Sequence, residues 1–340
     1  MLIARLLPSY PKASTMPSTD VIIGIIIIVA LGIVVRFVAG YVTAKAGGNG
    51  KQRRENAKAL KEQADWLRSH HQIIWVNSPA HLRSSLEGWP DAASANYAMC
   101  RGVPIDRFNF GDGPHEAEML SNAWGIRNAS ELRRQLLSLL QHGHRERFDA
   151  ERQNWANLKG ADERRVRGAM YKAAQEGADS AEEFRRYRWV RQNANDCLAT
   201  NFLAWDLVRV IMLCRAGVAA GYLSEDEALD TAWIASRGLQ ETYSSWQDMV
   251  HHFFEARWYW SSEDGVDGEL GRQHNDHAKQ VLATASDSPW AMVPWTAQIP
   301  TPNYLILDHM PHAYPNPAPQ VRATWTEQLE YAISQRADSQ

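Results

Sequence analysis

Three side chains that could perform acid–base chemistry stand at His144, Asp206 and Arg209. Asp206 and Arg209 are three residues apart in an apolar stretch, so on a helix both point to nearly the same face. Together with His144 and Arg145 they could line a polar pocket, where a buried, paired carboxylate beside an imidazole acquires a pKa suited to catalysis. The alternative is a buried ion pair that fixes helix packing, in which loss of either partner costs about 3–5 kcal/mol.

Aromatic side chains are a second candidate feature, because the chain contains 14 tryptophans. Tryptophan is large and amphipathic, so these residues must either build a core or line a groove for a partner. The candidate binding residues are Trp205, Trp246, Arg145 and Tyr222. The candidate groove for a partner peptide comprises Trp205, Trp233, Trp246, Trp258 and Trp260, and a tryptophan-rich core is the alternative.

Motifs for metals and cofactors are sparse in this sequence. His251 and Glu255 are four residues apart and could share a metal on one helix face, and His274 and His277 are three apart. No third ligand follows at the spacing of known zinc sites, and neither HExxH nor paired CxxC occurs. The chain also lacks GxSxG, P-loop and GxGxxG patterns. We therefore expect no metal and no cofactor.

The net charge indicates which class of partner to expect, and the cysteine content indicates the redox compartment. The formal net charge is −3, so the chain lacks the basic character typical of nucleic-acid-binding proteins, and we expect no nucleic-acid partner. Three cysteines, at Cys100, Cys197 and Cys214, are too few for a disulfide framework. This usage suits a reducing compartment such as the cytoplasm.

An apolar stretch near the N-terminus predicts a membrane anchor over Val21–Val42. Its only charge is Arg36, and about 20 apolar residues suffice to cross a hydrocarbon core about 30 Å thick. Arg36 lies close enough to the end of the span for its guanidinium to reach the headgroups. A cleaved signal peptide is the alternative, although the stretch is long and its downstream flank is basic.

The distribution of lysine and arginine predicts how this anchor is oriented. Six basic side chains follow the span before residue 62, whereas only Arg5 and Lys12 precede it, and neither would remain if translation starts at Met16. The positive-inside rule then places residues 1–20 outside as a short extracytoplasmic tail and the main domain in the cytoplasm. Residues 43–60 form a basic juxtamembrane linker.

The chain beyond the anchor is predicted to be all-α. No run of alternating β-branched residues is long enough for a sheet, whereas N-cap residues followed three positions later by an acidic side chain recur. The most apolar of the predicted helices covers residues 195–220 and contains Asp206 and Arg209. The capping pairs are Asn128 with Glu131, Ser180 with Glu183, Ser224 with Glu227, and Ser245 with Asp248.

Three segments divide this cytoplasmic part. Residues 61–120 are expected to form a helix followed by an irregular segment, since glycine and proline are dense between positions 86 and 118. Residues 121–300 form the helical domain. Residues 301–340 form a proline-rich tail with a helix at its end.

Short aromatic and polar motifs follow one another in order from Trp124 to Trp295, over about half of the chain. They are WGI at 124–126, GHR at 143–145 with Phe148 after it, WDLVR at 205–209, AAGY at 219–222, SSW at 244–246, and SPW with PW between 288 and 295. This series resembles the bacterial domain of unknown function family 1266. The charged segment between Phe148 and Asn195 is longer than the family pattern. The resemblance implies an all-helical bacterial domain and supplies no activity.

The sequence as a whole predicts a membrane-anchored helical domain at the cytoplasmic face of a bacterial inner membrane. An anchor combined with helices that carry no legible active site favours a module that binds a protein partner. One alternative is an enzyme with a helical active site around Asp206, Arg209 and His144. Another is a component of a toxin or immunity system, which rests only on how helical domains of this kind are often deployed.

Overall fold

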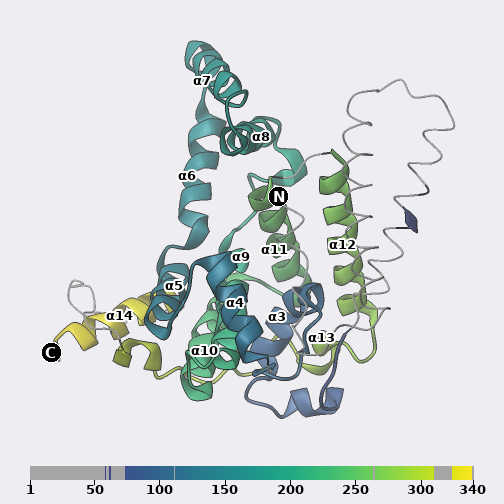
Figure 1. The fold of residues 1–340 in the computed structure, drawn as a ribbon, viewed down its shortest axis with the longest axis vertical. Coiled ribbons are helices and arrows are strands. Elements are labelled where there is room, and N and C mark those ends of the chain that lie inside the picture. Colours follow the sequence, from purple (N-terminus) through teal and green to yellow (C-terminus); the bar gives the residue numbers. More distant parts are fainter. Residues whose placement is uncertain are drawn as a thin grey trace. The chain divides into compact units, whose positions relative to one another are not determined.

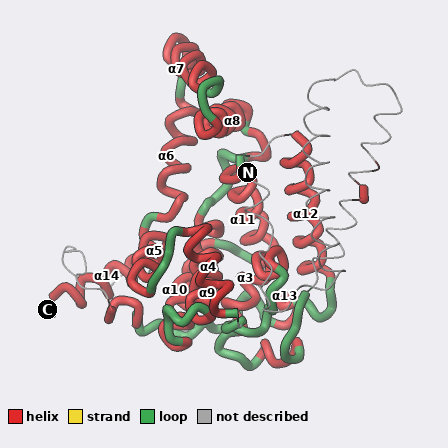
Figure 2. The backbone as a smooth tube through the Cα atoms, viewed as in Figure 1, coloured by secondary structure: helices red, strands yellow, loops and turns green. Residues whose placement is uncertain are grey.

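The computed structural model describes residues 58, 61–62, 73–110, 112–262, 265–309 and 324–338. Helices, turns and loops account for these residues, and no strand occurs among them (Figure 2). The prediction of an all-α fold is therefore confirmed. The predicted span Val21–Val42 lies outside the described residues. Within the described ranges, no helix combines the length and the apolar character needed to cross a membrane.

Contacts divide the chain into two compact units. One combines residues 1–72 with residues 263–277, and the other comprises residues 73–262 and 278–340. Helix α12 (Gly265–Thr284) contributes residues to both units. The second unit contains the fold and the candidate site described below.

Helix α9 (Leu203–Ala219) is the centre of the larger unit. Every residue from Leu203 to Val218 is buried, as suits the most apolar of the predicted helices. A helix that is covered all round can be apolar all round, as this stretch of sequence is. The helices packed on α9 are α3 (Gly88–Arg101), α4 (Gly113–Trp124), α5 (Ala129–Gln141), α6 (Gly143–Asn157), α10 (Glu225–Thr242) and α11 (Trp246–Ser261) (Figure 1).

Helix α9 begins eight residues later than the sequence predicts. Asn193, Asn195 and Asp196 have φ angles of 47°, 51° and 54°, in the left-handed region that interrupts a right-handed helix. They end α8 (Ala178–Gln192) and form the short turn η3 (Ala194–Asp196). Asparagine and aspartate tolerate this conformation better than other side chains, so this polar run forms a link rather than a first helical turn.

The glycine- and proline-rich segment between positions 86 and 118 was expected to be irregular, but much of it forms α3 and the first turns of α4. Residues 103–110 between these helices are irregular as expected. Gly88 and Pro90 lie in the first turn of α3, where the missing N–H of proline costs no intrahelical hydrogen bond. Gly102 follows the last residue of α3 with φ 65°, a left-handed cap that glycine adopts without strain. Gly113 and Pro114 open α4 in the same way. These residues therefore mark helix ends.

Helix capping was predicted correctly at three of four positions. The fourth, Ser180 with Glu183, is wrong, because α8 begins at Ala178 and Ser180 lies inside its first turn. The side-chain oxygens of Asn128, Ser224 and Ser245 accept hydrogen bonds from the backbone N–H groups of Glu131, Glu227 and Asp248 at 3.0, 3.1 and 3.1 Å.

Helices α6, α7 (Gly160–Ala173) and α8 form an arm, which Figure 1 shows leading away from α5. Helix α7 has no buried residue and packs chiefly on α8. Arginines of α8 fasten the base of the arm: Arg186 donates from Nη1 to Ser262 Oγ at 2.9 Å and contacts Glu151 of α6 at 3.3 Å. Arg191 donates to the carbonyl of Trp155 at the end of α6. The base is therefore fixed, while α7 is exposed.

Indole N–H groups hold the proline-rich segment after α12 against the helices. Trp89 and Trp246 donate from Nε1 to backbone carbonyls of residues 295 and 293 at 3.1 and 2.9 Å. Trp290 donates in the other direction, to a carbonyl of α3 at 3.0 Å. The remaining short elements are η2 (Pro79–Arg83), α13 (Pro289–Met292) and η4 (Leu305–His309), and the chain ends with α14 (Trp325–Asp338), where a final helix was predicted.

A second charged pair lies buried where α3 meets α9. Arg215 is fully buried and donates to Ser94 Oγ at 3.2 Å and to backbone carbonyls of the loop after α3. The carboxylate of Asp91 is also fully buried, 3.9 Å from Arg215 Nε, and accepts no hydrogen bond from the described residues. Burial raises the pKa of Asp91 well above its usual value, although the charge of Arg215 opposes the shift.

Replacing Asp91 with asparagine is expected to remove a pH-dependent loss of stability. Because the folded pKa is raised, the native carboxyl is favoured while it is protonated, and its ionisation as the pH rises destabilises the fold. Urea unfolding should show Asp91→Asn gaining stability over wild type as the pH rises from about 4, near the unfolded pKa, until the folded carboxyl is ionised. The exposed Asp287→Asn should show no such trend. A relative loss of stability on raising the pH would mean that Asp91 is ionised and paired with Arg215.

Candidate functional site

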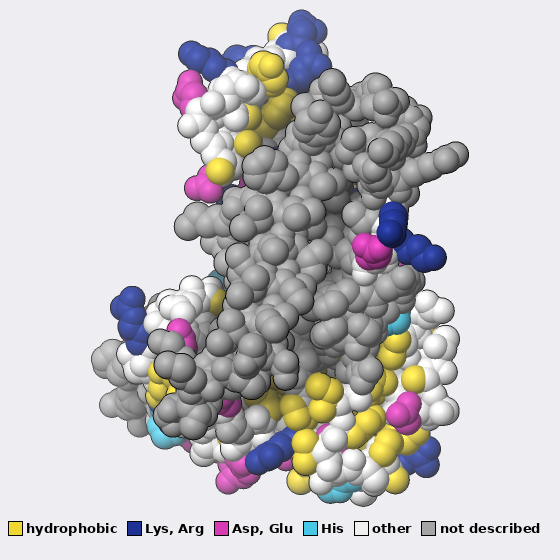
Figure 3. Space-filling model, turned by 45° about the vertical axis from the view of Figure 1, so that its right-hand side comes forward, with side chains coloured by type: hydrophobic (Ala, Val, Ile, Leu, Met, Phe, Trp, Pro, Cys, Tyr) yellow, Lys and Arg dark blue, Asp and Glu magenta, His cyan; other side chains and the backbone are white. Residues whose placement is uncertain are grey.

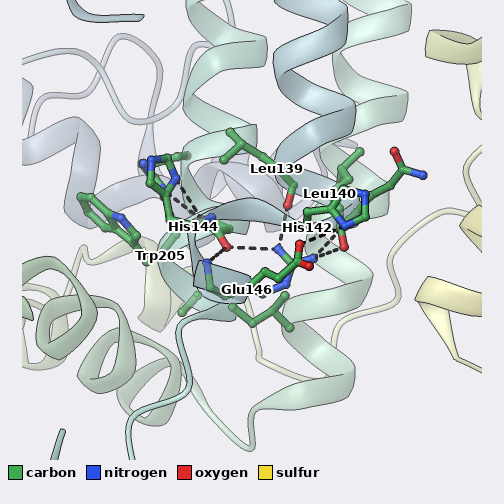
Figure 4. A network of polar contacts seen from close by, with 12 residues as sticks. Leu139, Leu140, His142, His144, Glu146 and Trp205 are labelled. Carbon is green, nitrogen blue, oxygen red and sulfur yellow. Dashed lines mark hydrogen bonds and ion pairs between the residues drawn. The ribbon is translucent and has the colours of Figure 1, made fainter. Parts of the chain in front are cut away.

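Figure 4 shows a network of polar contacts around the start of α6, near His144 and the carbonyls of Leu139 and Leu140. The hydrogen bonds of this cluster centre on Asp206 and join α5, α6 and α9. The carboxylate of Asp206 is 0% exposed. It accepts the backbone N–H groups of His144 and Arg145 at 3.0 and 3.1 Å, and side-chain N–H groups of Arg145 and Arg209 at 3.1 and 2.7 Å. Four donors occupy the acceptor sites of an ionised carboxylate.

The start of α6 is shaped to receive this carboxylate. The first backbone N–H groups of a helix have no intrahelical partner and favour an anion. Gly143 has φ 64°, and a Cβ atom placed on it would lie 1.9 Å from Asp206 Oδ2. Glycine is therefore required both by the backbone conformation and by the close approach of the carboxylate. The GHR motif supplies this glycine and two of the amides that bind the anion.

The guanidinium of Arg145 caps the C-terminal end of α5. Its Nη1 donates to the carbonyl of Leu139 at 2.7 Å, and its Nη2 donates to the carbonyls of Leu140 and Gln141 at 2.7 and 2.8 Å (Figure 4). The last carbonyls of a helix lack intrahelical donors, and a cation there also complements the helix dipole. One arginine therefore links the end of α5 to the anion at the start of α6.

The guanidinium of Arg209 is held on all sides. Its Nε donates to the carbonyl of Trp205 at 2.8 Å, and its Nη2 lies 2.7 Å from Asp206 Oδ1 and 2.9 Å from His144 Nδ1. The guanidinium carbon is 4.3 and 5.4 Å from the ring centroids of Trp205 and Trp124. Cation–π contact with two indoles offsets part of the cost of burying the charge.

The contact with Arg209 orients the ring of His144. A guanidinium can only donate, so Nδ1 of His144 accepts this hydrogen bond. Its Nδ1 is 3.7 Å from Asp206 Oδ1, beyond hydrogen-bonding distance. With 37% of its side chain exposed, His144 is the member of the cluster that solvent reaches most.

The electrostatics keep Asp206 ionised. Burial alone would raise its pKa, but the hydrogen bond from the backbone N–H of His144 and the charges of Arg209 and Arg145 outweigh it, so the pKa lies below its usual value. Burial lowers the pKa of Arg209, and Asp206 opposes that shift. A carboxylate with a lowered pKa and no free acceptor site is a poor general base.

Little space adjoins this cluster. A cavity of about 10 Å³ lies beside Arg209, enough for about one water molecule. Among the described residues, no group of three or more His, Cys, Asp or Glu side chains could hold a metal ion. The other residues that line the cavity are Tyr97, Arg101, Met119, Trp124, Met212 and Leu213.

The structure brings together five of the residues selected from the sequence and separates two from them. His144, Arg145, Trp205, Asp206 and Arg209 form the cluster described above. Trp246 is 4% exposed and packs with three other indoles near α13, and Tyr222 lies in the turn beyond the far end of α9.

The five tryptophans of the predicted groove do not lie side by side. Trp205 contacts Trp260, with ring centroids 5.4 Å apart, and Trp258 stacks on Trp189 of α8 at 4.1 Å. Trp233 donates to a backbone carbonyl of the loop before α3. Burial of Trp205, Trp246 and Trp258 places them in the core, in line with the alternative interpretation.

A cleft between α7 and α8, not anticipated from the sequence, is much larger than the cavity beside Arg209. Its volume is about 280 Å³. A signal for it was present, because Phe184, Arg188 and Arg191 recur at intervals of four and three and so share one face of α8. The residues that line it are Glu163, Arg167, Phe184, Tyr187, Arg188, Arg191 and Gln192.

Comparison with known proteins gives a family and two relatives. A family model described as "Protein of unknown function (DUF1266)" matches residues 119–295, which confirms the resemblance seen in the sequence motifs. "Uncharacterized protein YbeR" of Escherichia coli (strain K12) is 28% identical over 148 residues, which are 43% of this chain and 58% of YbeR. "Uncharacterized protein YbeU" of the same organism is 27% identical over 197 residues, 52% of this chain and 75% of YbeU. No solved structure matches the chain.

Replacing Asp206 with asparagine is expected to destabilise the fold by about 3–5 kcal/mol, because Arg145 and Arg209 lose the charge that compensates their burial. Urea denaturation gives this free energy of unfolding directly. The exposed Asp287→Asn should change it by less than about 0.5 kcal/mol. An Asp206→Asn variant as stable as wild type would show that the cluster does not hold the helices together.

A comparison of Gly143→Ala with Gly160→Ala separates the cost of backbone strain from the cost of displacing the Asp206 carboxylate. Gly160 has φ 57°, and a Cβ added there would meet no atom within 4 Å, so Gly160→Ala should cost only about 1–2 kcal/mol. Gly143→Ala carries the same strain and also displaces the Asp206 carboxylate, which adds about 1–3 kcal/mol. Thermal and urea unfolding of the two variants compare these costs. Equal losses would mean that the close approach at Gly143 is unimportant.

Proposed function

The chain belongs to the DUF1266 family, and we propose that it is a non-catalytic binding module, tethered to the cytoplasmic membrane, that captures a protein partner through its α6–α8 arm. The observation that carries the proposal is the saturation of the Asp206 carboxylate. Asp206, Arg145 and Arg209, which looked suited to catalysis in the sequence, instead join the ends of helices. The exposed aromatic and arginine side chains that suit binding of a partner lie on the arm.

An enzyme built on Asp206, Arg209 and His144 is disfavoured by their geometry. General acid–base catalysis needs a lone pair or proton within reach of a substrate. The acceptor sites of Asp206 are occupied by four donors, and the guanidinium of Arg209 is enclosed by two indoles. The cavity beside Arg209 has room for about one water molecule and is too small for a substrate.

The arm has the features of a recognition surface. Helix α7 buries none of its residues, so its side chains contribute little to the core. Tyr171 on α7 is 58% exposed and contacts the ring of Phe184 edge-on at 5.8 Å. Figure 3 shows Lys and Arg side chains gathered with hydrophobic ones over α7 and α8. Tyrosine and arginine are the side chains that most often anchor protein interfaces.

The tether in this proposal is the sequence Val21–Val42 with its basic flank. Its length and composition support a single span, and the lysines and arginines that follow support a cytoplasmic domain. A tethered module searches for partners along a surface, which raises their effective concentration.

Charges placed in the apolar stretch are expected to release the full-length chain from membranes. Ile26→Lys with Ile28→Lys should cost about 2.5–3.5 kcal/mol for each lysine at the centre of a span. Val76→Lys with Leu86→Lys, at exposed positions of the larger unit, should leave the distribution unchanged. Immunoblots of carbonate-washed membranes and supernatants measure the partition. A wild-type chain found wholly in the supernatant would refute the tether.

A photo-crosslinking amino acid at position 171 of the full-length chain, expressed in the cells that produce it, is expected to give one discrete protein adduct. The same amino acid at Tyr331, 43% exposed on α14, should not give this adduct. The captured protein is identified by mass spectrometry, and the adduct is then reproduced with the purified partner. Identical adducts from both positions, or none from position 171, would contradict recognition by the arm.

A further inference from the structure

The cleft between α7 and α8 combines confined space with positive charge. Its volume of about 280 Å³ is near the lower end for ligand sites, so it suits a small molecule. Three arginines, Arg167, Arg188 and Arg191, line it together with one acid, Glu163. Three positive charges and one negative charge give the lining a net charge of +2. This charge favours binding of a ligand with two negative charges.

The three guanidinium groups differ in how they are held. Arg191 Nη1 donates to the carbonyls of Trp155 and Ala156 at 2.8 and 2.9 Å, so its position is fixed by the end of α6. Arg167 has only a long contact of 3.8 Å with Glu163. Arg188 is exposed and has no hydrogen bond or ion pair within the described part of the chain. One guanidinium is therefore preorganised, and two have donors available for a ligand.

Arg188 differs from two other exposed arginines of this arm. Arg147 and Arg165 are also exposed, and each is paired along its own helix, Arg147 with Glu151 at 2.8 Å and Arg165 with Asp162 at 2.9 Å. Such pairs are the ordinary arrangement for charged residues on a solvated helix. Arg188 instead faces the cleft with its charge uncompensated.

The acid and the aromatic residues of the cleft are also ordered. Glu163 accepts a hydrogen bond from Tyr187 Oη at 2.9 Å, which fixes the carboxylate. The ring of Phe184 lies nearly parallel to that of Tyr187, with centroids 6.1 Å apart and an interplanar angle of 13°. Phe184 is partly exposed, so it gives the cleft an apolar wall beside the guanidinium groups.

From this arrangement we propose that the cleft binds a small phosphate monoester. Guanidinium groups match phosphate oxygens with paired N–H donors. A monoester carries about −1.5 to −2 charge near pH 7, which complements the lining, whereas a carboxylate neutralises only half of it. The phosphate lies between Arg167, Arg188 and Arg191, and its organic group packs on Phe184. This site does not depend on the protein partner proposed above, and either proposal can fail alone.

Calorimetric titration of the full-length chain with phenyl phosphate tests the site. Saturable binding is expected, and Arg167→Ala with Arg188→Ala should weaken it by at least about tenfold. Benzoate and inorganic phosphate should each bind at least about tenfold more weakly than phenyl phosphate, because one lacks the second charge and the other the ring. Arg165→Ala, which removes an exposed charge of α7 that does not line the cleft, is the control and should leave binding unchanged.

Three results would overturn the proposal. The first is no saturable binding of phenyl phosphate up to about 10 mM, a concentration that still reveals very weak sites. The second is an equal loss of binding in the Arg165→Ala control, which indicates general attraction to a basic helix. The third is a peptide bearing phosphotyrosine that binds more than about tenfold more tightly than phenyl phosphate, which assigns the cleft to a protein ligand.

Discussion

A carboxylate removed from water must be met by donors, and the donors of Asp206 join three helices. An unpaired charge at such a depth costs several kcal/mol, so the packing that supplies the partners is strongly selected over alternatives. The amides come from the first turn of α6, one guanidinium spans to the end of α5, and the other belongs to α9. The ends of α5 and α6 are therefore set relative to the central helix by one side chain.

Arginine performs the same task elsewhere in the larger unit. Arg145 binds the last carbonyls of α5, Arg191 those of α6, and Arg215 the carbonyls of the loop after α3. Helix ends and loops carry backbone groups that no helix satisfies, and five donors on a long stem can reach several of them together. In a fold built only of helices, these side chains provide the connections between elements that strands provide in a sheet.

The sequence predicted the features that depend on local chemistry. Asn128, Ser224 and Ser245 begin helices where their side chains can accept the backbone N–H, and the apolar run containing Asp206 is the buried helix.

The sequence-based predictions failed where contacts between distant parts of the chain decide the outcome. Proline and glycine near position 90 and position 113 mark helix ends, which composition alone does not distinguish from a loop. The tryptophans are numerous enough to suggest one groove, yet packing distributes them among separate clusters. The arginine-lined cleft was missed because it needs two helices, and each alone resembles a solvated surface.

Helix α7 touches the core so little that its composition is constrained mainly by its contact with α8. Substitutions on its outer face are expected to leave the buried cluster around Asp206 intact. The shape and charge of this surface can therefore change with little effect on the stability of the scaffold beneath it.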